Sequence, residues 1–557
     1  MARLSIWETP RGRVELPNMA VVVNPNLISV PTNEIREMGF QLIMTNSYIL
    51  RRRGFSGDVH NLLEHNGPVY TDSGAYQLFS RGIEDQDSIE IVRYQLEINS
   101  DVITPFDLLV MPWDSEEEAM RKAIETVERV KEAIPLVREK GKLIVAPIQG
   151  GRHPKVRRKC ARELGKLRAD VYAIGVVVPD LLEYNFKEVV DAIAISKEEI
   201  PLSRPCHLFG AGHPMVLPLY VALGCDLFDS AMYAIAARDG RYLTHSGSLR
   251  LDEMEEFPCN CPVCYNKSPG EVSGWSKRKR EYFISKHNLY SVLLELKRIR
   301  EAIRRNRLLD LVLERANAHP MLKEATLYSL KRLSVLMEEL DPLEKKSGLR
   351  HIGPETSLRP EVRRARRLMR RIRSTKSRIY VDPFGPVPIE ILKVYPFGQF
   401  VSPRETPRLE VDPNSLFRAL MEYLYDVRIR ERFEFTFSKE GRIKDVILNG
   451  ERIGSIRAKD HFFVPNIRGA RLILEKSEYP RNRVIIKKEA EDFVSRGKSV
   501  FCKFVLDLDS ELRPMQYVPV VNEEDELIAV GKLILSPREV FDFERHVAVR
   551  VKRGVMN

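Results

Sequence analysis

The chain has 557 residues, more than one hydrophobic core organises, which indicates about three or four domains. Hydrophobic residues make up 43% and charged residues 30%, so fibrous and intrinsically disordered classes are excluded. No apolar run approaches the roughly 20 residues of a membrane span, and the N-terminal residues lack the pattern of a signal peptide, so we expect a cytoplasmic protein. The net charge of +11 suggests a polyanionic partner, although many basic proteins share it.

Residues 20 to 240 repeat one pattern, a short apolar or β-branched run that ends in polar or glycine residues and is followed by helical periodicity. Eight such runs begin at Ala20, Leu42, Val69, Asp101, Leu143, Tyr172, His207 and Leu227. Eight strands alternating with helices predict an α/β fold, a (β/α)8 TIM barrel. A doubly wound open sheet is the alternative on this pattern alone.

Polar residues stand at or just beyond the expected ends of these strands: Asp72, Asp107, Gln149, Gly175, His207, His213 and Asp229. Barrel enzymes build their active sites at this end of the strands. A helix cap, a turn or a packing residue explains any one position equally well. Three carboxylates and an amide at one barrel mouth are different, because their mutual repulsion requires a ligand or a catalytic use.

The segment CNCPVC supplies Cys259, Cys261 and Cys264, and His287 follows after 22 residues. Three thiolates and one imidazole are the ligands of a closed tetrahedral zinc site, which leaves no position for a catalytic water. The pattern predicts one structural Zn²⁺ per chain. A chance cluster of buried free cysteines is the alternative, and the other four cysteines are interpreted as packing residues.

Beyond Glu339 the strand and helix alternation ends. In the segment from Arg359 to Arg378, 10 of 20 residues are Lys or Arg. Arg363, Arg367 and Arg370 are spaced i, i+4, i+7, so a helix here would present a cationic face to nucleic-acid phosphates. An ordinary solvated helix is the alternative.

The motifs TDSGAYQ, PIQGG, YAIGVVVP, HLFGAGHPM and LFDSAMYAIAARDGRYLT, with the cysteine cluster, resemble the archaeal branch of the tRNA-guanine transglycosylase family. The resemblance spans about residues 18 to 303, and residues 484 to 540 resemble a PUA RNA-binding domain. It implies a transferase that replaces guanine at position 15 of the tRNA D-arm with 7-cyano-7-deazaguanine, in archaeosine biosynthesis. It also implies a homodimer.

The resemblance further implies a double displacement, in which Asp229 is the nucleophile that forms a covalent ribosyl intermediate and Asp72 is the general acid and base. It assigns the binding of the base to Asp107, Gln149, Ser73 and the Gly175-Val176 segment. Tyr76 is expected to stack on the base or to be a core aromatic beneath the loop. The basic helix residues Arg363, Arg367 and Arg370 are expected to contact tRNA.

The expected domains are a catalytic barrel over 1–340 with a zinc-binding insertion at about 255–303, a basic helical linker domain over 341–405, an α+β domain over 406–479 and a PUA domain over 480–557. Two other functions are considered: an archaeosine synthase-like paralogue that acts on the nitrile, and a non-catalytic tRNA-binding protein. The carboxylates Asp72, Asp107 and Asp229 argue against both.

Overall fold

The computed structural model describes residues 1–346, 348–351, 353–373, 375, 377–399 and 411–557. The chain divides into two compact units, Met1–Arg332 and Leu333–Asn557, and each is described by itself. No helix in the described ranges combines the length and apolar character needed to cross a lipid bilayer.

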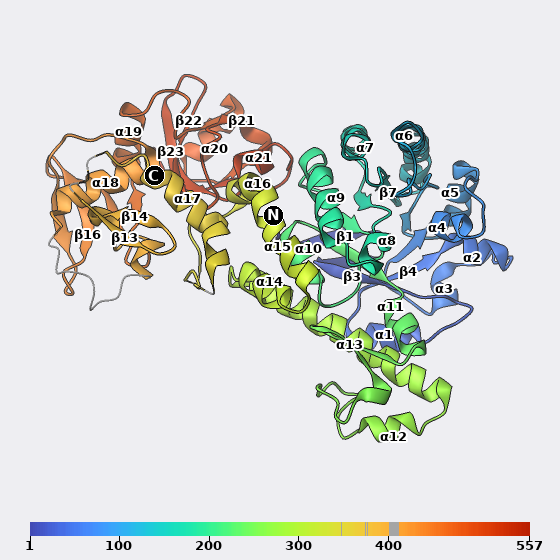
Figure 1. Cartoon of the computed structure of the whole chain (residues 1–557). Helices are drawn as coiled ribbons and strands as arrows, with labels where there is room; N and C mark the ends of the chain where they lie inside the picture. Colours follow the sequence, from blue (N-terminus) through green and yellow to red (C-terminus); the bar gives the residue numbers. More distant parts are fainter. Residues whose placement is uncertain (347, 352, 374, 376, 400–410) are drawn as a thin grey trace. The chain divides into compact units, whose positions relative to one another are not determined.

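The first unit contains a closed barrel of parallel strands in the order β10-β3-β4-β5-β6-β7-β8-β9 (Figure 1). Because β10 pairs with both β3 and β9, the sheet has no edge, and the TIM-barrel prediction is confirmed over the open-sheet alternative. The strands are β3 (Asn18–Val22), β4 (Leu42–Asn46), β5 (Val69–Asp72), β6 (Val102–Ile103), β7 (Leu143–Ile148), β8 (Val171–Ile174), β9 (Cys206–Leu208) and β10 (Leu227–Ser230).

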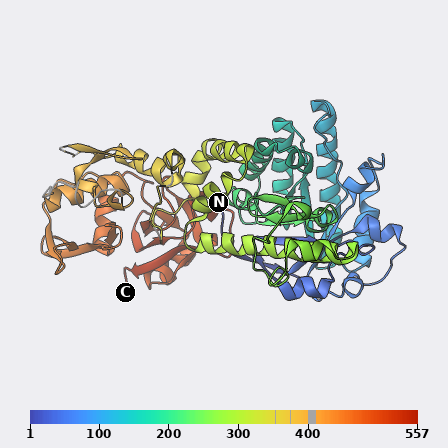
Figure 2. The ribbon, with the colours of Figure 1, turned by 60° about the horizontal axis from the view of Figure 1, so that its bottom comes forward.

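Helices surround this ring of strands, as Figures 1 and 2 show. Those between the strands are α1 (Thr32–Met38), α2 (Ser47–Arg52), α3 (Val59–Leu63), α4 (Ala75–Phe79), α5 (Ser88–Glu97), α6 (Glu116–Glu139), α7 (Pro154–Lys166), α8 (Val178–Leu182), α9 (Phe186–Glu199) and α10 (Leu217–Ala222), and α11 (Met232–Arg238) follows β10. The helices expected between the strands from the helical periodicity of residues 20 to 240 are therefore confirmed.

A hairpin of β1 (Ser5–Thr9) and β2 (Gly12–Leu16) precedes the barrel and is absent from the sequence prediction, which starts at Ala20. Its side chains Trp7 and Val14 belong to the same hydrophobic cluster as barrel residues such as Tyr70. The hairpin therefore completes the packing of the barrel interior.

The insertion after α11 contains β11 (Arg241–Thr244), β12 (Gly247–Arg250), α12 (Pro269–Ser273) and the start of the long helix α13 (Lys277–Arg304), and it projects from the barrel in Figure 1. A small core that includes Tyr242, Val272 and Phe283 holds it together. The unit ends with α14 (Leu308–Ala316) and α15 (Pro320–Arg332).

The second unit begins with α16 (Ser334–Leu340), α17 (Pro360–Met369), β13 (Arg378–Val381), β14 (Gly385–Pro388) and α18 (Pro413–Tyr425). A four-stranded sheet follows, with β15 (Glu434–Phe437), β16 (Ile443–Leu448), β17 (Glu451–Ile456) and β18 (Phe463–Pro465), and then α19 (Ile467–Glu475). One hydrophobic cluster contains residues from Leu343 to Ile473, so the segments expected as two domains share a core. The boundary expected at residues 405 and 406 lies outside the described residues.

The C-terminal segment forms a six-stranded sheet in the order β20-β24-β23-β22-β19-β21 around its own hydrophobic cluster. Its elements are β19 (Val484–Ile486), α20 (Glu491–Ser495), β20 (Val500–Phe501), β21 (Val505–Leu508), β22 (Tyr517–Val521), β23 (Leu527–Leu533), α21 (Pro537–Val540) and β24 (Val547–Gly554). A small β-rich fold here agrees with the PUA domain expected over 480–557.

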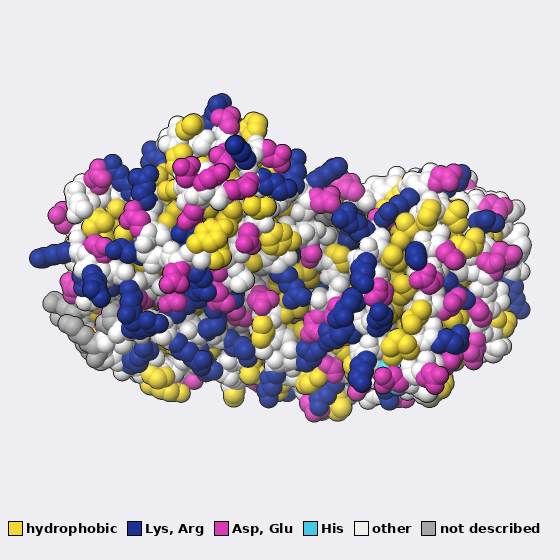
Figure 3. Space-filling view, turned by 90° about the horizontal axis from the view of Figure 1, so that it is seen from above, with side chains coloured by type: hydrophobic (Ala, Val, Ile, Leu, Met, Phe, Trp, Pro, Cys, Tyr) yellow, Lys and Arg dark blue, Asp and Glu magenta, His cyan; other side chains and the backbone are white. Residues whose placement is uncertain are grey.

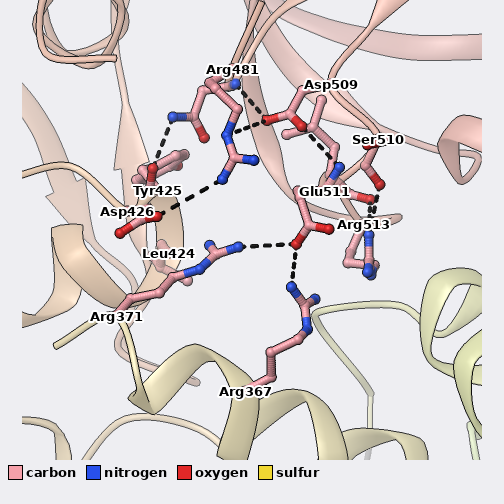
Figure 4. A network of polar contacts seen from close by, with 12 residues as sticks. Arg367, Arg371, Leu424, Tyr425, Asp426, Arg481, Asp509, Ser510, Glu511 and Arg513 are labelled. Atoms are coloured by element: carbon pink, nitrogen blue, oxygen red, sulfur yellow. Dashed lines mark hydrogen bonds and ion pairs between the residues drawn. The ribbon is translucent and has the colours of Figure 1, made fainter. Parts of the chain in front are cut away.

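Ion pairs connect the elements of the second unit (Figure 4). Arg367 of α17 contacts both Glu338 of α16 and Glu511, and Arg371 reaches the same Glu511 at 3.2 Å. Arg513 places two guanidinium nitrogens on Glu338, at 3.2 and 2.8 Å. The basic segment around α17 therefore uses part of its charge inside the protein.

Lys and Arg side chains lie among Asp and Glu side chains on the face of the molecule shown in Figure 3. Net charge alone therefore does not locate a nucleic-acid surface, and each basic residue has to be judged by its partners.

Removing one partner of the buried pair of Glu338 and Arg513 should strongly destabilise the second unit. Burial opposes ionisation of Glu338, but the hydrogen bond and charge of Arg513, with the charges of Arg364 and Arg367, outweigh it and lower the pKa of Glu338 to about 2. Glu338→Gln should cost about 3–5 kcal/mol, because it leaves a buried guanidinium without its counter-charge. Hydrogen exchange at the amides of residues 333–557, recorded while the full chain is unfolded in urea, measures the loss in unfolding free energy of the second unit.

Glu339→Gln is the matched control, since the Glu339 side chain is 34% exposed and lies 3.9 Å from Arg538. It should change stability by less than about 1 kcal/mol. The Glu338 contribution should be complete above the ordinary glutamate pKa and should fade as the pH drops toward 2. Equal unfolding curves for the two variants would contradict the assignment.

Candidate active site

The barrel brings the predicted polar residues to one mouth. Asp72 ends β5 and Asp229 lies in β10, while Gln149 and Gly175 directly follow β7 and β8. Asp107 lies in the segment that follows β6. Because parallel strands end on the same side of a barrel, these side chains share the carboxyl-terminal face.

Asp72 is held by donors from the neighbouring strand and from its own turn. Asn46, the last residue of β4, donates its Nδ2 hydrogen to Oδ2 of Asp72 at 2.7 Å and contacts Oε1 of Gln77 at 2.9 Å. The backbone N–H of Gly74 donates to the same Asp72 oxygen at 3.2 Å. Gly74 has a φ of 90°, and a Cβ there would lie 2.4 Å from Cβ of Tyr48, so this turn requires glycine.

Asp229 has one oxygen fully engaged. The Gly210 N–H donates to Oδ1 at 2.7 Å, and Nε2 of His207 lies 3.0 Å from the same atom. Nδ1 of His207 lies 3.2 Å from the Tyr70 hydroxyl, and both rings are buried. The other carboxylate oxygen, Oδ2, is therefore the one available to react.

Asp107 and Gln149 form a buried polar pair near the barrel mouth. The Gln149 amide donates from Nε2 to Oδ2 of Asp107 at 2.5 Å, and its Oε1 accepts from the Val110 N–H at 3.1 Å. Ser73 places its hydroxyl 3.4 Å from Oδ1 of Asp107. These contacts fix the amide so that its nitrogen faces the carboxylate.

The segment after β8 closes against this amide. A Cβ on Gly175 would lie 2.8 Å from Nε2 of Gln149, so only glycine lets the backbone approach so closely. Val176 has a φ of 56°, which is strained for a β-branched residue and costs on the order of 1–3 kcal/mol. Strain of this kind is typical of functional sites.

Two of the carboxyl groups at the mouth, Asp72 and Asp107, have raised pKa values. Burial raises the pKa of Asp72 to about 7, the charges of Asp107 and Asp229 add to the rise, and the Gly74 and Asn46 donors oppose it. Burial raises the pKa of Asp107 to about 6 against its hydrogen bonds to Gln149 and Ser73. One carboxyl group poised near neutrality beside an engaged carboxylate suits general acid and base catalysis.

Tyr76 is 43% exposed on α4, so it is not the core aromatic that was the alternative. Of the basic residues expected to contact tRNA, Arg363 and Arg370 are exposed, and Arg370 follows the end of α17. Arg367 differs from the expectation of a free cationic face, because Glu338 and Glu511 already pair with it.

The sequence prediction missed the groups that position the carboxylates. Asn46 and Tyr70 were not singled out, and His207 was noted at a strand end without a role. Asn46 contacts Asp72 and Tyr70 contacts His207, and in each pair the two residues lie on different strands. A local sequence pattern does not reveal such contacts. The TNS and VYTD segments, with polar residues inside otherwise apolar strands, were the available signal.

The four predicted metal ligands come together in the insertion. The ligand atoms of Cys259, Cys261, Cys264 and His287 all lie within 4.8 Å of one another, so they could hold a metal ion. Nε2 of His287 lies 3.0 Å from the Leu243 carbonyl oxygen, which leaves Nδ1 facing the thiols. Such a contact to the outer ring nitrogen is typical of a metal-binding histidine.

Three family models match the chain. The model described as queuine tRNA-ribosyltransferase covers residues 1–321, the patch-forming domain C2 of tRNA-guanine transglycosylase covers residues 417–480, and the PUA domain covers residues 482–555. These matches extend the resemblance from the barrel motifs to most of the chain.

Relatives named tRNA-guanine(15) transglycosylase match over nearly their whole length. One from Pyrococcus abyssi is 40% identical and covers 99% of this chain and 96% of the relative. One from Korarchaeum cryptofilum is 38% identical and covers 100% of this chain and 96% of the relative. One from Methanocaldococcus jannaschii is 35% identical and covers 100% of this chain and 98% of the relative. With the barrel mouth and the accessory domains in agreement, the chain belongs to the tRNA-guanine transglycosylase family.

Proposed function

We propose that this protein replaces guanine at position 15 of tRNA with 7-cyano-7-deazaguanine, in archaeosine biosynthesis, by a double displacement. The observation that supports it most is the barrel mouth, where burial and the charges of Asp107 and Asp229 raise the pKa of Asp72, while the buried amide of Gln149 donates to Asp107. The names of the relatives and the PUA match support tRNA as the substrate.

In the first step, Oδ2 of Asp229 attacks C1′ of the target ribose. The bond from C1′ to the guanine nitrogen breaks, and its electron pair leaves with the base. Asp72, whose pKa of about 7 leaves a large protonated fraction at neutral pH, donates the proton that neutralises the departing base. The product is a ribosyl ester of Asp229.

In the second step, the incoming base gives its ring N–H proton to ionised Asp72. Its nitrogen then attacks C1′, and the electron pair of the ester bond returns to Asp229. One carboxyl group thus serves both directions, because its raised pKa makes it a competent acid and a competent base near pH 7.

The pocket of Asp107 and Gln149 selects a guanine-like edge. An ionised Asp107 accepts from a ring N–H and an exocyclic amine, while the Gln149 amide nitrogen and backbone N–H groups after β8 donate to the carbonyl. An adenine edge would leave these buried groups unpaired, which costs on the order of 1–3 kcal/mol for each group. The Tyr76 ring is proposed to stack on the base.

The metal is proposed to be zinc, bound by three thiolates and one imidazole, a donor set that prefers Zn²⁺ and leaves no open position for chemistry. It would stabilise the insertion.

We also propose that the protein acts in the cytoplasm as a homodimer and that Arg363 and Arg370 contact tRNA phosphates.

The exchange reaction itself tests the function. Unmodified tRNA with radiolabelled guanine should incorporate label, and 7-cyano-7-deazaguanine should then displace it without ATP. A protein that binds tRNA but exchanges no base would support the non-catalytic alternative, and one that acts only on the nitrile of an already modified tRNA would support the paralogue.

Asp229→Ala should abolish base exchange and covalent trapping of tRNA, because it removes the carboxylate that is proposed to attack C1′. The affinity for tRNA should stay largely unchanged, since phosphate contacts lie elsewhere. Gel analysis of denatured enzyme–tRNA mixtures and a tRNA binding assay measure the two effects. Base exchange near the wild-type rate would exclude Asp229 as nucleophile.

Asp72→Asn should preserve the fold and greatly reduce turnover, because the amide accepts and donates hydrogen bonds but moves no proton. In the wild type, single-turnover release of guanine should slow as the pH rises above about 7, where Asp72 loses its proton. The variant should lack this pH dependence. Unchanged turnover would remove Asp72 from the mechanism.

His207 is proposed to position Asp229 rather than to touch substrate. The Tyr70 hydroxyl donates to Nδ1 and so leaves the hydrogen on Nε2, where it donates to Oδ1 of Asp229. Burial and the charge of Asp229 raise the pKa of Tyr70, so its hydroxyl stays protonated as a donor. The contacts to Oδ1 thereby aim the carboxylate and leave Oδ2 for the attack.

His207→Phe should lower kcat about ten- to a hundredfold, since a hydrogen bond to a charged group contributes about 1.5–3 kcal/mol. KM for tRNA should change little, because His207 contacts the carboxylate and not the RNA. Tyr70→Phe should have a smaller effect that disappears in the His207→Phe background. His65→Phe, at a buried histidine without hydrogen-bond partners for its ring, is the packing control. A His207→Phe enzyme with the wild-type kcat would refute this positioning role.

Cys261→Ala should lose the bound metal and lower the thermal stability of the insertion, because a structural site needs all four ligands. Use of tRNA should be impaired while the pocket of Asp107 is intact. Cys502→Ala, at a buried cysteine outside the cluster, should keep full metal content. Metal analysis and thermal unfolding decide the question, and full zinc in the Cys261 variant would contradict the ligand assignment.

A further inference from the structure

An arginine-rich hollow lies on the mouth side of the barrel. It has a volume of about 370 Å³ and is lined by Asn24, Asn26, Tyr48, Ile49, Arg52, Arg53 and Arg81. These residues follow the carboxyl ends of β3, β4 and β5, the same edge that carries Asp72. A position at this edge is on the face where the proposed substrate enters.

The hollow is linked to the catalytic carboxylate through short structural connections. Asn46, which donates to Asp72, also caps the start of helix α2, and that helix ends at Arg52. Tyr48 packs against the Gly74 turn two residues beyond Asp72. A neighbouring hollow of about 230 Å³ shares Tyr48 and Arg52 and reaches Ser73. The arginines are therefore one helix away from the reacting group.

The charges in the hollow are unbalanced. Arg51 is paired with Glu90 at 2.9 Å, whereas no acidic group among the described residues forms an ion pair with Arg52, Arg53 or Arg81. All three of these side chains are exposed. Three guanidinium groups around one hollow repel one another unless an anion lies between them.

Arg81 is held in place from one side. Its Nη1 donates to the Tyr48 hydroxyl at 3.2 Å, and its guanidinium lies 5.6 Å from the centre of the Tyr48 ring. This arrangement keeps the guanidinium at the hollow with donors to spare, which suits a phosphate oxygen. Asn24 and Asn26 add amide groups that can bind a sugar hydroxyl.

We propose that the hollow lined by Arg52, Arg53 and Arg81 binds an RNA phosphodiester next to the exchanged nucleotide. The proposal rests on the proposed function, which brings a nucleotide to Asp72 and Asp229. Three carboxylates at the mouth repel the phosphates of the entering strand, and a cationic hollow at the rim offsets that repulsion. Extruding the target nucleotide costs a few kcal/mol of unstacking, and the phosphate contact helps to offset that cost.

The test compares two triple variants with equal loss of charge. In the first, Arg52, Arg53 and Arg81 are changed to Gln. In the control, Arg36, Arg93 and Lys140 are changed to Gln; these exposed residues lie on the outer helix α1, on α5 and at the end of α6. Helices of a barrel run opposite to its strands, so the last turns of α1 and α6 lie away from the mouth.

The first variant should raise the dissociation constant and KM for tRNA about tenfold or more, with kcat little changed. The slope of log affinity against log salt should flatten by about 0.7 for each lost contact to single-stranded phosphate. The control variant should show neither effect. Equal weakening in both variants would mean a general field effect, and no weakening in the first would mean no contact; either result overturns the proposal.

A modified substrate locates the contact. Two modified tRNAs each carry one neutral methylphosphonate linkage, one on the 5′ side and one on the 3′ side of the target nucleotide. At the contacted linkage, the change should weaken tRNA binding to the wild type. The same change should weaken binding to the variant lacking Arg52, Arg53 and Arg81 only slightly, because the contact is already lost. Full additivity at both linkages would overturn the proposal. Binding of tRNA is measured separately from base exchange. A wild type that exchanges no base would therefore refute the proposed function, while the binding comparison would still test the phosphate contact.

Discussion

The repulsion among three carboxylates at one barrel mouth is the constraint on which the site depends. Each is offset by a donor from an adjacent strand or turn: Asn46 for Asp72, Gln149 for Asp107, and Gly210 with His207 for Asp229. A parallel closed sheet makes this possible, because neighbouring strands end side by side on one face. The donors oppose the effect of burial, which raises the pKa of Asp107 to about 6 and, with the charges of Asp107 and Asp229, that of Asp72 to about 7. In Asp229, a single oxygen, Oδ1, contacts both the Gly210 N–H and Nε2 of His207.

Close backbone approach is the second requirement, and it explains the glycines of the motifs. Gly74 lets the turn after β5 pack on Tyr48, and Gly175 lets the backbone after β8 touch the Gln149 amide. A side chain at either position would displace the group that orients a carboxylate. The positive φ of Val176 beside this contact shows that the scaffold holds the segment against its local preference.

The sequence was most informative where one residue pattern determines one structural feature. Apolar runs that end in polar residues located all eight barrel strands and the carboxylates at their ends, and the cysteine spacing located the metal cluster. The hairpin of residues 5–16 was missed because its alternation is short and its role is to pack against strands distant in sequence. Asn46, Tyr70 and His207 act on residues 22 to 137 positions away, which a local pattern does not encode.

The basic segments show why charge runs are poor guides to function by themselves. Arg367 lies in the most basic stretch of the chain, yet Glu338 and Glu511, 29 and 144 positions away, pair with it and make it part of the internal framework. The shorter run of Arg51, Arg52 and Arg53 is less conspicuous, but only its first member is paired with an acid in the described chain. Density of positive charge predicts a solvated or paired helix as readily as an RNA surface. An unbalanced cluster that surrounds a hollow beside reacting groups is the stronger indication, because its electrostatic cost is relieved only when an anion binds.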